Sequence, residues 1–243
     1  MVPRWCIGVL AAVVVAGCGA DDDDAGDLTV AAASSVQDAI RACAPDVRAS
    51  FAGSDELAAQ VRQGLPVDVF LAANTALPAA LADDGLLDDP VAFATNALVV
   101  AVPADSGVRA LTDLARPGVD LAIGAEGVPV GDYTREVLAR LPAVQERAIL
   151  ANVRSEEPDV KGVVGKLTQG AVDAGVVYAT DVEAASGRLR AVAIPADLEP
   201  DVAYGAGVVT ASERRDQAAD FVAALTDGPC ADALRARGFG PPP

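Results

Sequence analysis

The chain has 243 residues, of which 52% are hydrophobic, and its 35 acidic side chains outnumber 18 basic ones to give a formal net charge of −17. This charge excludes a nucleic-acid binder as a serious candidate, because neutralising phosphates requires basic patches. Histidine is absent, which excludes a Ser-His-Asp hydrolase and zinc sites built on imidazole. We therefore expect no Ser-His-Asp triad and no zinc site of this kind, and we also expect no cofactor.

The first 17 residues predict a lipoprotein signal peptide. Arg4 precedes an apolar run that is too short to span a bilayer. The run ends in Val15-Ala16-Gly17-Cys18, which resembles the bacterial lipobox, where the chain is cut before a cysteine that then carries lipid. The alternative is an ordinary secretory signal with an incidental cysteine, which gives a periplasmic protein. We expect lipid on Cys18 to anchor the exported protein to the outer face of the membrane, with the acidic segment 18–26 as a solvated tether.

Strand-like and helix-like segments alternate from residue 28 to residue 239. Strands are predicted at 28–32, 67–72, 97–102, 121–124, 175–178, 189–194 and 204–209. Segments with helical periodicity occupy 35–44, 54–63, 75–83, 111–114, 131–141, 160–169 and 181–185. This alternation predicts an α/β protein in which mainly parallel sheets are flanked by helices.

Two apolar junctions, at 94–102 and 203–209, suggest that the chain crosses twice between two lobes. Lobe one would then hold residues 27–96 plus 207–243, and lobe two residues 97–206. A cleft between the carboxyl ends of strands in two such lobes commonly binds a small ligand.

Two cysteines, Cys43 and Cys230, remain in the exported part of the chain. A cysteine pair in an oxidising compartment usually forms a disulfide, which here would tie the first helix to the last and hold both chain ends in one lobe. Two free buried thiols are the alternative.

Several predicted helices begin directly after a strand. Ser34 and Ser54 stand at two such places, where first-turn N–H groups and the helix dipole favour an anion, although each serine also fits an ordinary N-cap. Asp132 and Asp159 are expected to cap two further helices. Tyr178 ends a buried strand, and its hydroxyl points either into the cleft or to solvent.

The helix starts belong to a longer ordered set of segments. They are Ala31-Ala-Ala-Ser34, Phe51-Ala-Gly-Ser54, Pro66-Val-Asp68-Val-Phe70-Leu-Ala-Ala, Val128-Pro-Val130-Gly-x-Tyr133, Asp159-Val160-Lys161 and Gly175-Val-Val-Tyr178-x-x-Asp181. In this order they resemble the motifs of the periplasmic molybdate-binding proteins, over about residues 27–240. The resemblance implies a type II periplasmic-binding-protein fold, in which two α/β lobes close on molybdate or tungstate in the interlobe cleft.

The resemblance also implies a set of neutral ligand donors. Ser34 and Ser54 would supply hydroxyl and backbone N–H groups from lobe one. Val130 and Val160 would supply backbone N–H groups from lobe two, and Tyr178 its phenol, with no protein group bound directly to the metal. Asp55 departs from the family pattern. We expect it to point outward, because a carboxylate in the cleft would repel the anion.

The function that this resemblance implies is capture of molybdate, and of tungstate, by a monomeric solute-binding protein that serves the permease of an ABC-type importer and catalyses nothing. One alternative is a binder of sulfate, thiosulfate or another tetrahedral anion. A second is a sensor that has no permease partner. A third is an exported lipoprotein hydrolase with Ser34 as nucleophile and Lys161 or Lys166 as base.

Overall fold

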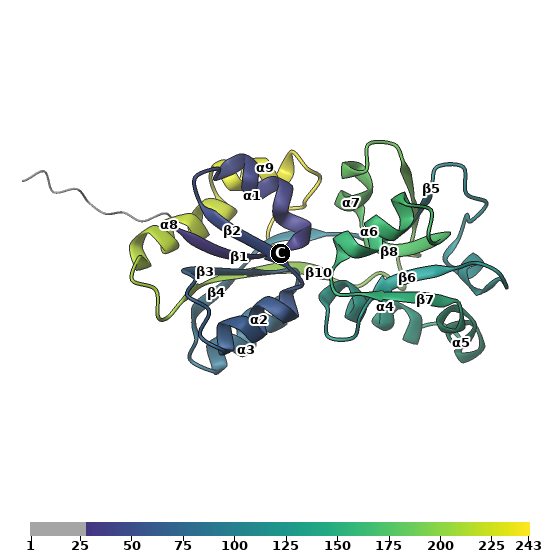
Figure 1. Ribbon diagram of the computed structural model, residues 1–243, viewed down its shortest axis with the longest axis horizontal. Coiled ribbons are helices and arrows are strands. Elements are labelled where there is room, and N and C mark those ends of the chain that lie inside the picture. Colours follow the sequence, from purple (N-terminus) through teal and green to yellow (C-terminus); the bar gives the residue numbers. More distant parts are fainter. Residues whose placement is uncertain (1–27) are drawn as a thin grey trace, which may run out of the picture.

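Two α/β lobes lie side by side in the protein, each built around a five-stranded sheet (Figure 1). The structure is a computed structural model and describes residues 28–243. The predicted signal peptide 1–17, the tether 18–26 and the lipidation site Cys18 lie outside the described residues. Among residues 28–243, no helix has the length and apolar character needed to cross a membrane.

The sheet of lobe one has the strand order β2-β1-β3-β10-β4, and β10 alone runs against the other four. Its strands are β1 (Thr29–Ala33), β2 (Arg48–Ala52), β3 (Val69–Ala72), β4 (Leu87–Asn96) and β10 (Val202–Val209). The helices of this lobe are η1 (Ser34–Val36), α1 (Gln37–Cys43), α2 (Ser54–Arg62), α3 (Ala76–Asp83), α8 (Arg215–Thr226) and α9 (Pro229–Arg235). Figure 1 shows α1 and α9 on one side of the sheet and α2 and α3 on the other. The central strand β3 is buried and apolar along its whole length, as expected of a strand covered on both faces.

The sheet of lobe two has the order β7-β6-β8-β5-β9, and here β5 alone is reversed. Its strands are β5 (Leu98–Pro103), β6 (Leu121–Gly124), β7 (Val153–Glu157), β8 (Ala174–Tyr178) and β9 (Leu189–Ala193). Its helices are η2 (Leu111–Ala115), α4 (Pro129–Ala139), α5 (Ala143–Ala151), α6 (Val160–Thr168) and α7 (Ala179–Ala184). The predicted α/β class, with two mainly parallel sheets flanked by helices, is confirmed.

The chain passes between the lobes twice. β4 ends at Asn96 in the first sheet, and β5 begins at Leu98 in the second. On the return, β10 pairs with β3 and β4 from Val202 onward. Residues 202–206 therefore belong to the sheet of lobe one, whereas the sequence-based boundary places them in lobe two. The apolar run does not reveal this difference, because pairing register is set by the neighbouring strands.

Elements that the sequence pattern does not predict lie mostly at the edges of the fold. The edge strands β2 and β7 alternate exposed and half-buried residues, and β7 carries charged side chains such as Arg154 and Glu156. Such polar residues are typical of edge strands, which must avoid pairing with other chains. The strand β4 and the helices α5 and α8 are also additional to the prediction, which places a last helix at Cys230 without giving its range.

The predicted disulfide is present. Cys43 at the end of α1 and Cys230 near the start of α9 are joined, with their Cα atoms 5.0 Å apart. Both helices belong to lobe one, so the bridge ties the first part of this lobe to its last part, across 187 residues of sequence.

Asp68, a buried carboxylate, holds together the outer end of lobe one. It accepts hydrogen bonds from the backbone N–H of Thr29 at 2.8 Å, from the Thr29 hydroxyl at 2.7 Å and from the Ser212 hydroxyl at 2.7 Å. Arg214 lies 3.7 Å away. Burial alone would raise the pKa of Asp68, but the bonds from Thr29 and Ser212 and the charge of Arg214 outweigh it and lower that pKa.

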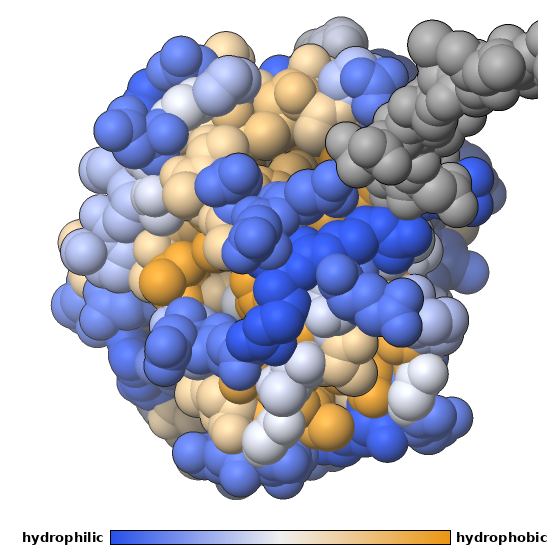
Figure 2. Space-filling view, turned by 90° about the vertical axis from the view of Figure 1, so that its left-hand side faces the viewer, coloured by the Kyte–Doolittle hydropathy of each residue, from blue (hydrophilic) through white to orange (hydrophobic). Residues whose placement is uncertain are grey.

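Large apolar side chains are scattered singly over the surface of the described residues. The exposed ones are Val91, Val144 and Leu150, at 39%, 71% and 39% exposure. Figure 2 views the end of lobe one and shows apolar areas interrupted by hydrophilic side chains. Isolated residues of this kind are normal on a protein surface and do not call for a partner.

Candidate functional site

A small cavity lies between the lobes, where strands of both sheets end against helix starts. Its volume is about 10 Å³, which is room for roughly one water-sized group. The five residues that the family resemblance selects all line it: Ser34, Ser54, Val130, Val160 and Tyr178. The other lining residues are Ala33, Ser35, Ala52, Gly53, Ala73, Val128, Pro129 and Asp159.

Larger hollows occur elsewhere on the described residues, but their chemistry differs. One of about 660 Å³ lies at the outer end of lobe one around Asp68, whose carboxylate is already satisfied by hydrogen bonds. Another, of about 320 Å³, opens beside the cavity and is lined by charges of both signs. The small cavity is distinguished by the neutral hydrogen-bond donors that converge on it from two lobes.

Ser34 and Ser54 form the wall from lobe one, and neither caps a helix through its side chain. Each is the first residue of its helix, after the N-cap positions Ala33 and Gly53. The interpretation of these serines as N-caps is therefore wrong. The Ser54 hydroxyl accepts a hydrogen bond from the backbone N–H of Ala73 at 3.0 Å. Because its oxygen is held in this way, its proton is available to the cavity.

The helix α4 supplies one wall from lobe two. Its first intrahelical hydrogen bond runs from the N–H of Asp132 to the oxygen of Val128, so the N–H groups of Val130 and Gly131 have no acceptor within the helix. A Cβ on Gly131 would lie 2.1 Å from the oxygen of Ala125. Glycine at this position lets the start of α4 rest directly on the end of β6. The predicted cap is wrong, because Asp132 instead accepts from the N–H of Gly127 at 2.8 Å.

The helix α6 supplies the second wall from lobe two. Asp159 caps it as predicted and accepts from the N–H of Gly162 at 2.9 Å. The N–H groups of Val160 and Lys161 then remain at the positive end of the helix. Opposite this turn, a Cβ on Gly53 would lie only 2.3 Å from the oxygen of Pro158. The two lobes thus meet backbone to backbone beside the cavity.

Tyr178 closes the cavity at the end of β8. The residue is 1% exposed, and within the described residues its hydroxyl has no hydrogen-bond partner. Burial raises the pKa of Tyr178 well above its ordinary value, and the neighbouring Tyr204 raises it further. The phenol is therefore protonated at physiological pH and can only donate to an anion. Ser35 lines the same cavity and has a buried hydroxyl without a partner in this part of the chain, a feature that the two adjacent serines do not reveal in the sequence.

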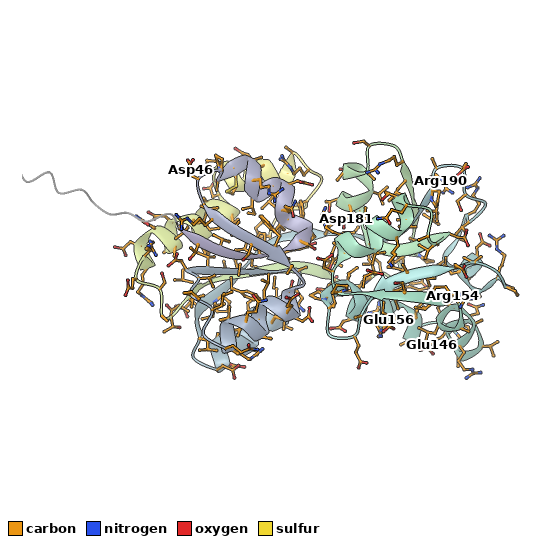
Figure 3. All side chains as sticks on the ribbon, in the orientation of Figure 1. Asp46, Glu146, Arg154, Glu156, Asp181 and Arg190 are labelled. Carbon is orange, nitrogen blue, oxygen red and sulfur yellow. A yellow bond between two sulfur atoms is a disulfide. The ribbon has the colours of Figure 1, made fainter. Side chains whose placement is uncertain are left out.

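The cations nearest the cavity are paired with carboxylates. Lys161 lies 3.1 Å from a carboxylate oxygen of Asp181 and 3.9 Å from one of Asp38. Asp181, labelled in Figure 3, lies at the junction-facing side of lobe two. Burial raises the pKa of Asp181, and the charge of Lys161 opposes that shift. Lys166 lies 3.6 Å from Glu157. Neither lysine lines the cavity with Ser34, which argues against a serine–lysine hydrolase.

Asp55 is half-buried and does not line the cavity. Its side chain does not simply point outward to solvent, however. Its Oδ1 atom is buried and has no hydrogen-bond partner among residues 28–243, and it would lie 2.8 Å from a Cβ on Gly53. The carboxylate thus lies behind the meeting point of the lobes, outside the cavity.

The comparisons with known proteins agree with this geometry. Residues 28–240 match the family model described as bacterial extracellular solute-binding protein. The molybdate-binding protein ModA of Mycobacterium tuberculosis (strain ATCC 25618 / H37Rv) is 31% identical over 98% of this chain and 100% of its own. The substrate-binding domain of a putative molybdenum ABC transporter from Clostridium difficile is 26% identical, with a TM-score of 0.65 over 88% of this chain and 98% of that one. The periplasmic molybdate-binding protein of Azotobacter vinelandii has the same fold, with a TM-score of 0.78 at 20% identity over 89% of this chain and 100% of that one. The chain therefore belongs to the bacterial extracellular solute-binding protein family.

Proposed function

We propose that the protein captures molybdate, and tungstate with it, outside the cell and delivers it to the permease of an ABC importer. The observation that carries this proposal is the donor set of the interlobe cavity. Hydroxyl and backbone N–H groups from both lobes face one small buried space, and no cationic side chain lines it. Sites of this kind bind fully deprotonated oxyanions through helix starts and neutral donors.

In this proposal the five residues selected by the family resemblance bind the anion from both lobes. Ser34 and Ser54 donate through hydroxyl and backbone N–H groups, Val130 and Val160 through backbone N–H groups, and Tyr178 through its phenol. A hydrogen bond to a charged group contributes about 1.5–3 kcal/mol. Roughly seven such bonds offset the cost of ordering and lobe closure and leave the ~8–12 kcal/mol of micromolar to nanomolar binding.

Protonation of the ligand gives one level of selectivity. A phosphate monoanion carries an O–H group that needs an acceptor, whereas molybdate, tungstate and sulfate are fully deprotonated near neutral pH. The carboxylate of Asp159, the ionisable acceptor in the lining, already caps its own helix. Donor-only cavities of this type therefore favour the fully deprotonated anions.

The size of the cavity relative to the anion gives the second level of selectivity. The space of about 10 Å³ is narrow for any four-oxygen anion, so the lobes must move apart slightly to admit one. Sulfate is smaller than molybdate, and this narrowness makes a sulfate binder the second candidate.

Delivery follows from closure of the lobes around the anion, and the permease recognises the closed form.

Lipid on Cys18 would hold the protein at the outer face of the membrane through the 18–26 tether. The exposed large apolar side chains are scattered singly, which supports a monomer. The paired lysines support binding without catalysis.

Isothermal titration of the purified protein with molybdate, tungstate, sulfate and phosphate tests the proposal. Tight binding of molybdate and tungstate alone is the expected result. Binding of sulfate in preference to molybdate would support the second candidate, and the absence of any response to molybdate would overturn the first.

A further inference from the structure

The hydroxyl of Tyr178 needs an orienting partner. It is buried, it lines the cavity, and the described residues offer it no hydrogen bond. A phenolic O–H can rotate about its C–O bond, so the direction of its proton depends on what its oxygen accepts. An anion gains from Tyr178 only when that proton points into the cavity.

Tyr204, on β10 in lobe one, is the neighbour that meets Tyr178 across the junction. Their ring centroids are 5.7 Å apart. Tyr204 is fully buried and is fixed by two further rings, Phe93 at 5.9 Å and Phe239 at 5.4 Å, both in edge-on contact. The hydroxyl of Tyr204 lies close enough to raise the pKa of Tyr178, after burial, but outside hydrogen-bond geometry in this arrangement.

Asn96 determines which way the proton of Tyr204 points. Its side-chain oxygen accepts from the backbone N–H of Ala97 at 2.9 Å, which sets the orientation of the amide. Its Nδ2 atom donates to Tyr204 Oη at 3.4 Å and to Thr180 Oγ1 at 3.0 Å. Because Tyr204 accepts from Asn96, its own proton is free for another acceptor. The buried hydroxyls beside it belong to Tyr178 and Ser35. Burial raises the pKa of Tyr204, and the hydroxyl of Ser35 lowers it, as a donor to its oxygen does.

We propose that Tyr204 is a positioning residue for ligand binding, in a chain that runs from Asn96 through Tyr204 to Tyr178 and ends on the anion. Once Tyr204 donates to the Tyr178 oxygen, the proton of Tyr178 points away from Tyr204 and into the cavity. Each bond in such a chain polarises the next. Tyr204 and Tyr178 belong to different lobes and pair with strand residues on either side of the crossover at 96–98, so the chain spans the junction between the lobes. This inference rests on the proposed oxyanion-binding function.

The test is a double-mutant cycle measured by titration with molybdate. Tyr204→Phe removes the hydroxyl and keeps the ring, and we expect it to weaken binding about 2- to 12-fold. In a Tyr178→Phe background the same change is expected to alter affinity by less than about twofold, because the hydroxyl that Tyr204 orients is then absent. Thr226→Val is the control: it removes a hydroxyl that donates to the oxygen of Ala223 within α8 and does not line the cavity, and affinity should be unchanged.

The outcomes separate this inference from the proposed function. If the unmodified protein binds molybdate but Tyr204→Phe binds equally well, or loses the same factor in both backgrounds, the positioning role is overturned and the function stands. If the unmodified protein binds no oxyanion, both fail together. Thermal unfolding reports whether the variants fold. Should Tyr204→Phe not fold, Asn96→Leu removes the donor to Tyr204, and its loss of affinity must likewise disappear in the Tyr178→Phe background.

Discussion

One added methyl group at Gly53 should prevent the lobes from closing while leaving each lobe folded. A Cβ at this position would lie 2.3 Å from the oxygen of Pro158 in lobe two, about 1 Å closer than the usual C···O contact of roughly 3.3 Å. The backbone at Gly53, with φ −61° and ψ 138°, is one that alanine adopts without strain. The methyl group of Gly53→Ala therefore acts on the distance between the lobes.

The expected loss follows from the donor count. A separation of about 1 Å stretches hydrogen bonds of about 2.9 Å beyond bonding range. In the proposed site, lobe two contributes the N–H groups of Val130 and Val160 and the hydroxyl of Tyr178. Losing two of these donors costs about 3 kcal/mol, which corresponds to a fall in molybdate affinity of about 150-fold.

Titration and thermal unfolding, with and without molybdate, measure this effect. Gly107→Ala is the matched control, because nothing lies within 4 Å of a Cβ at Gly107. We expect Gly53→Ala to unfold near the wild-type temperature without ligand and to show almost no stabilisation by molybdate. An affinity within about threefold of wild type would refute the reasoning, since the lobes would then bind the anion without the backbone contact.

Further predictions concern the serines, the disulfide and the buried carboxylate. Ser34→Ala should weaken molybdate binding by about 1–3 kcal/mol without lowering the unfolding temperature, because the Ser34 side chain does not cap the helix that it begins. Ser54→Ala should lower both the affinity for molybdate and the unfolding temperature, since the N–H of Ala73 loses its acceptor. Titration and thermal unfolding compare the two variants, and equal stability of the two would contradict this contrast. Cys230→Ser should lower the free energy of unfolding in urea by about 2–5 kcal/mol and leave affinity unchanged, because the bridge does not line the cavity; a parallel loss of affinity would show that it shapes the site. The lowered pKa of Asp68 contributes stability that is present above its ordinary value of 3.8 and is lost as pH falls through the folded-state value. Asp68→Asn should therefore be less stable than wild type at neutral pH, and the difference should shrink in urea titrations at increasingly acid pH; a constant difference between about pH 2 and 7 would argue against the linkage.

The parts of the fold that sequence predicts are those with strong local signals. The buried strand β8, the helix α6 with its Asp159 cap and the Cys43–Cys230 bridge all follow from periodicity, capping chemistry or cysteine count. The edge strands β2 and β7 do not, because exposed polar residues remove the apolar pattern that marks a strand. The lobe assignment of 202–206 also depends on strand partners far away in sequence.

For the candidate site, sequence identifies positions but not the roles of their atoms. The motifs select Ser34 and Ser54, yet their interpretation as caps is wrong, and the bond from Ala73 that frees the proton of Ser54 is visible only in the fold. The pairing of Lys161 with Asp181 joins residues on two different helices. Tyr204 and Ser35 have no sequence signal that separates them from ordinary buried residues.

By itself, the sequence determined that helices start directly after strands at several points, and that no histidine is present for catalysis or metal binding. These properties depend on neighbouring residues or on composition, so no folded structure is needed to see them. Only the tertiary structure decided that these helix starts converge on one cavity, that the nearby cations are paired, and that Tyr204 of one lobe meets Tyr178 of the other. The physical reason is that each of these contacts joins segments far apart in the chain, and their distances are set by packing within and between the lobes rather than by local conformational preference.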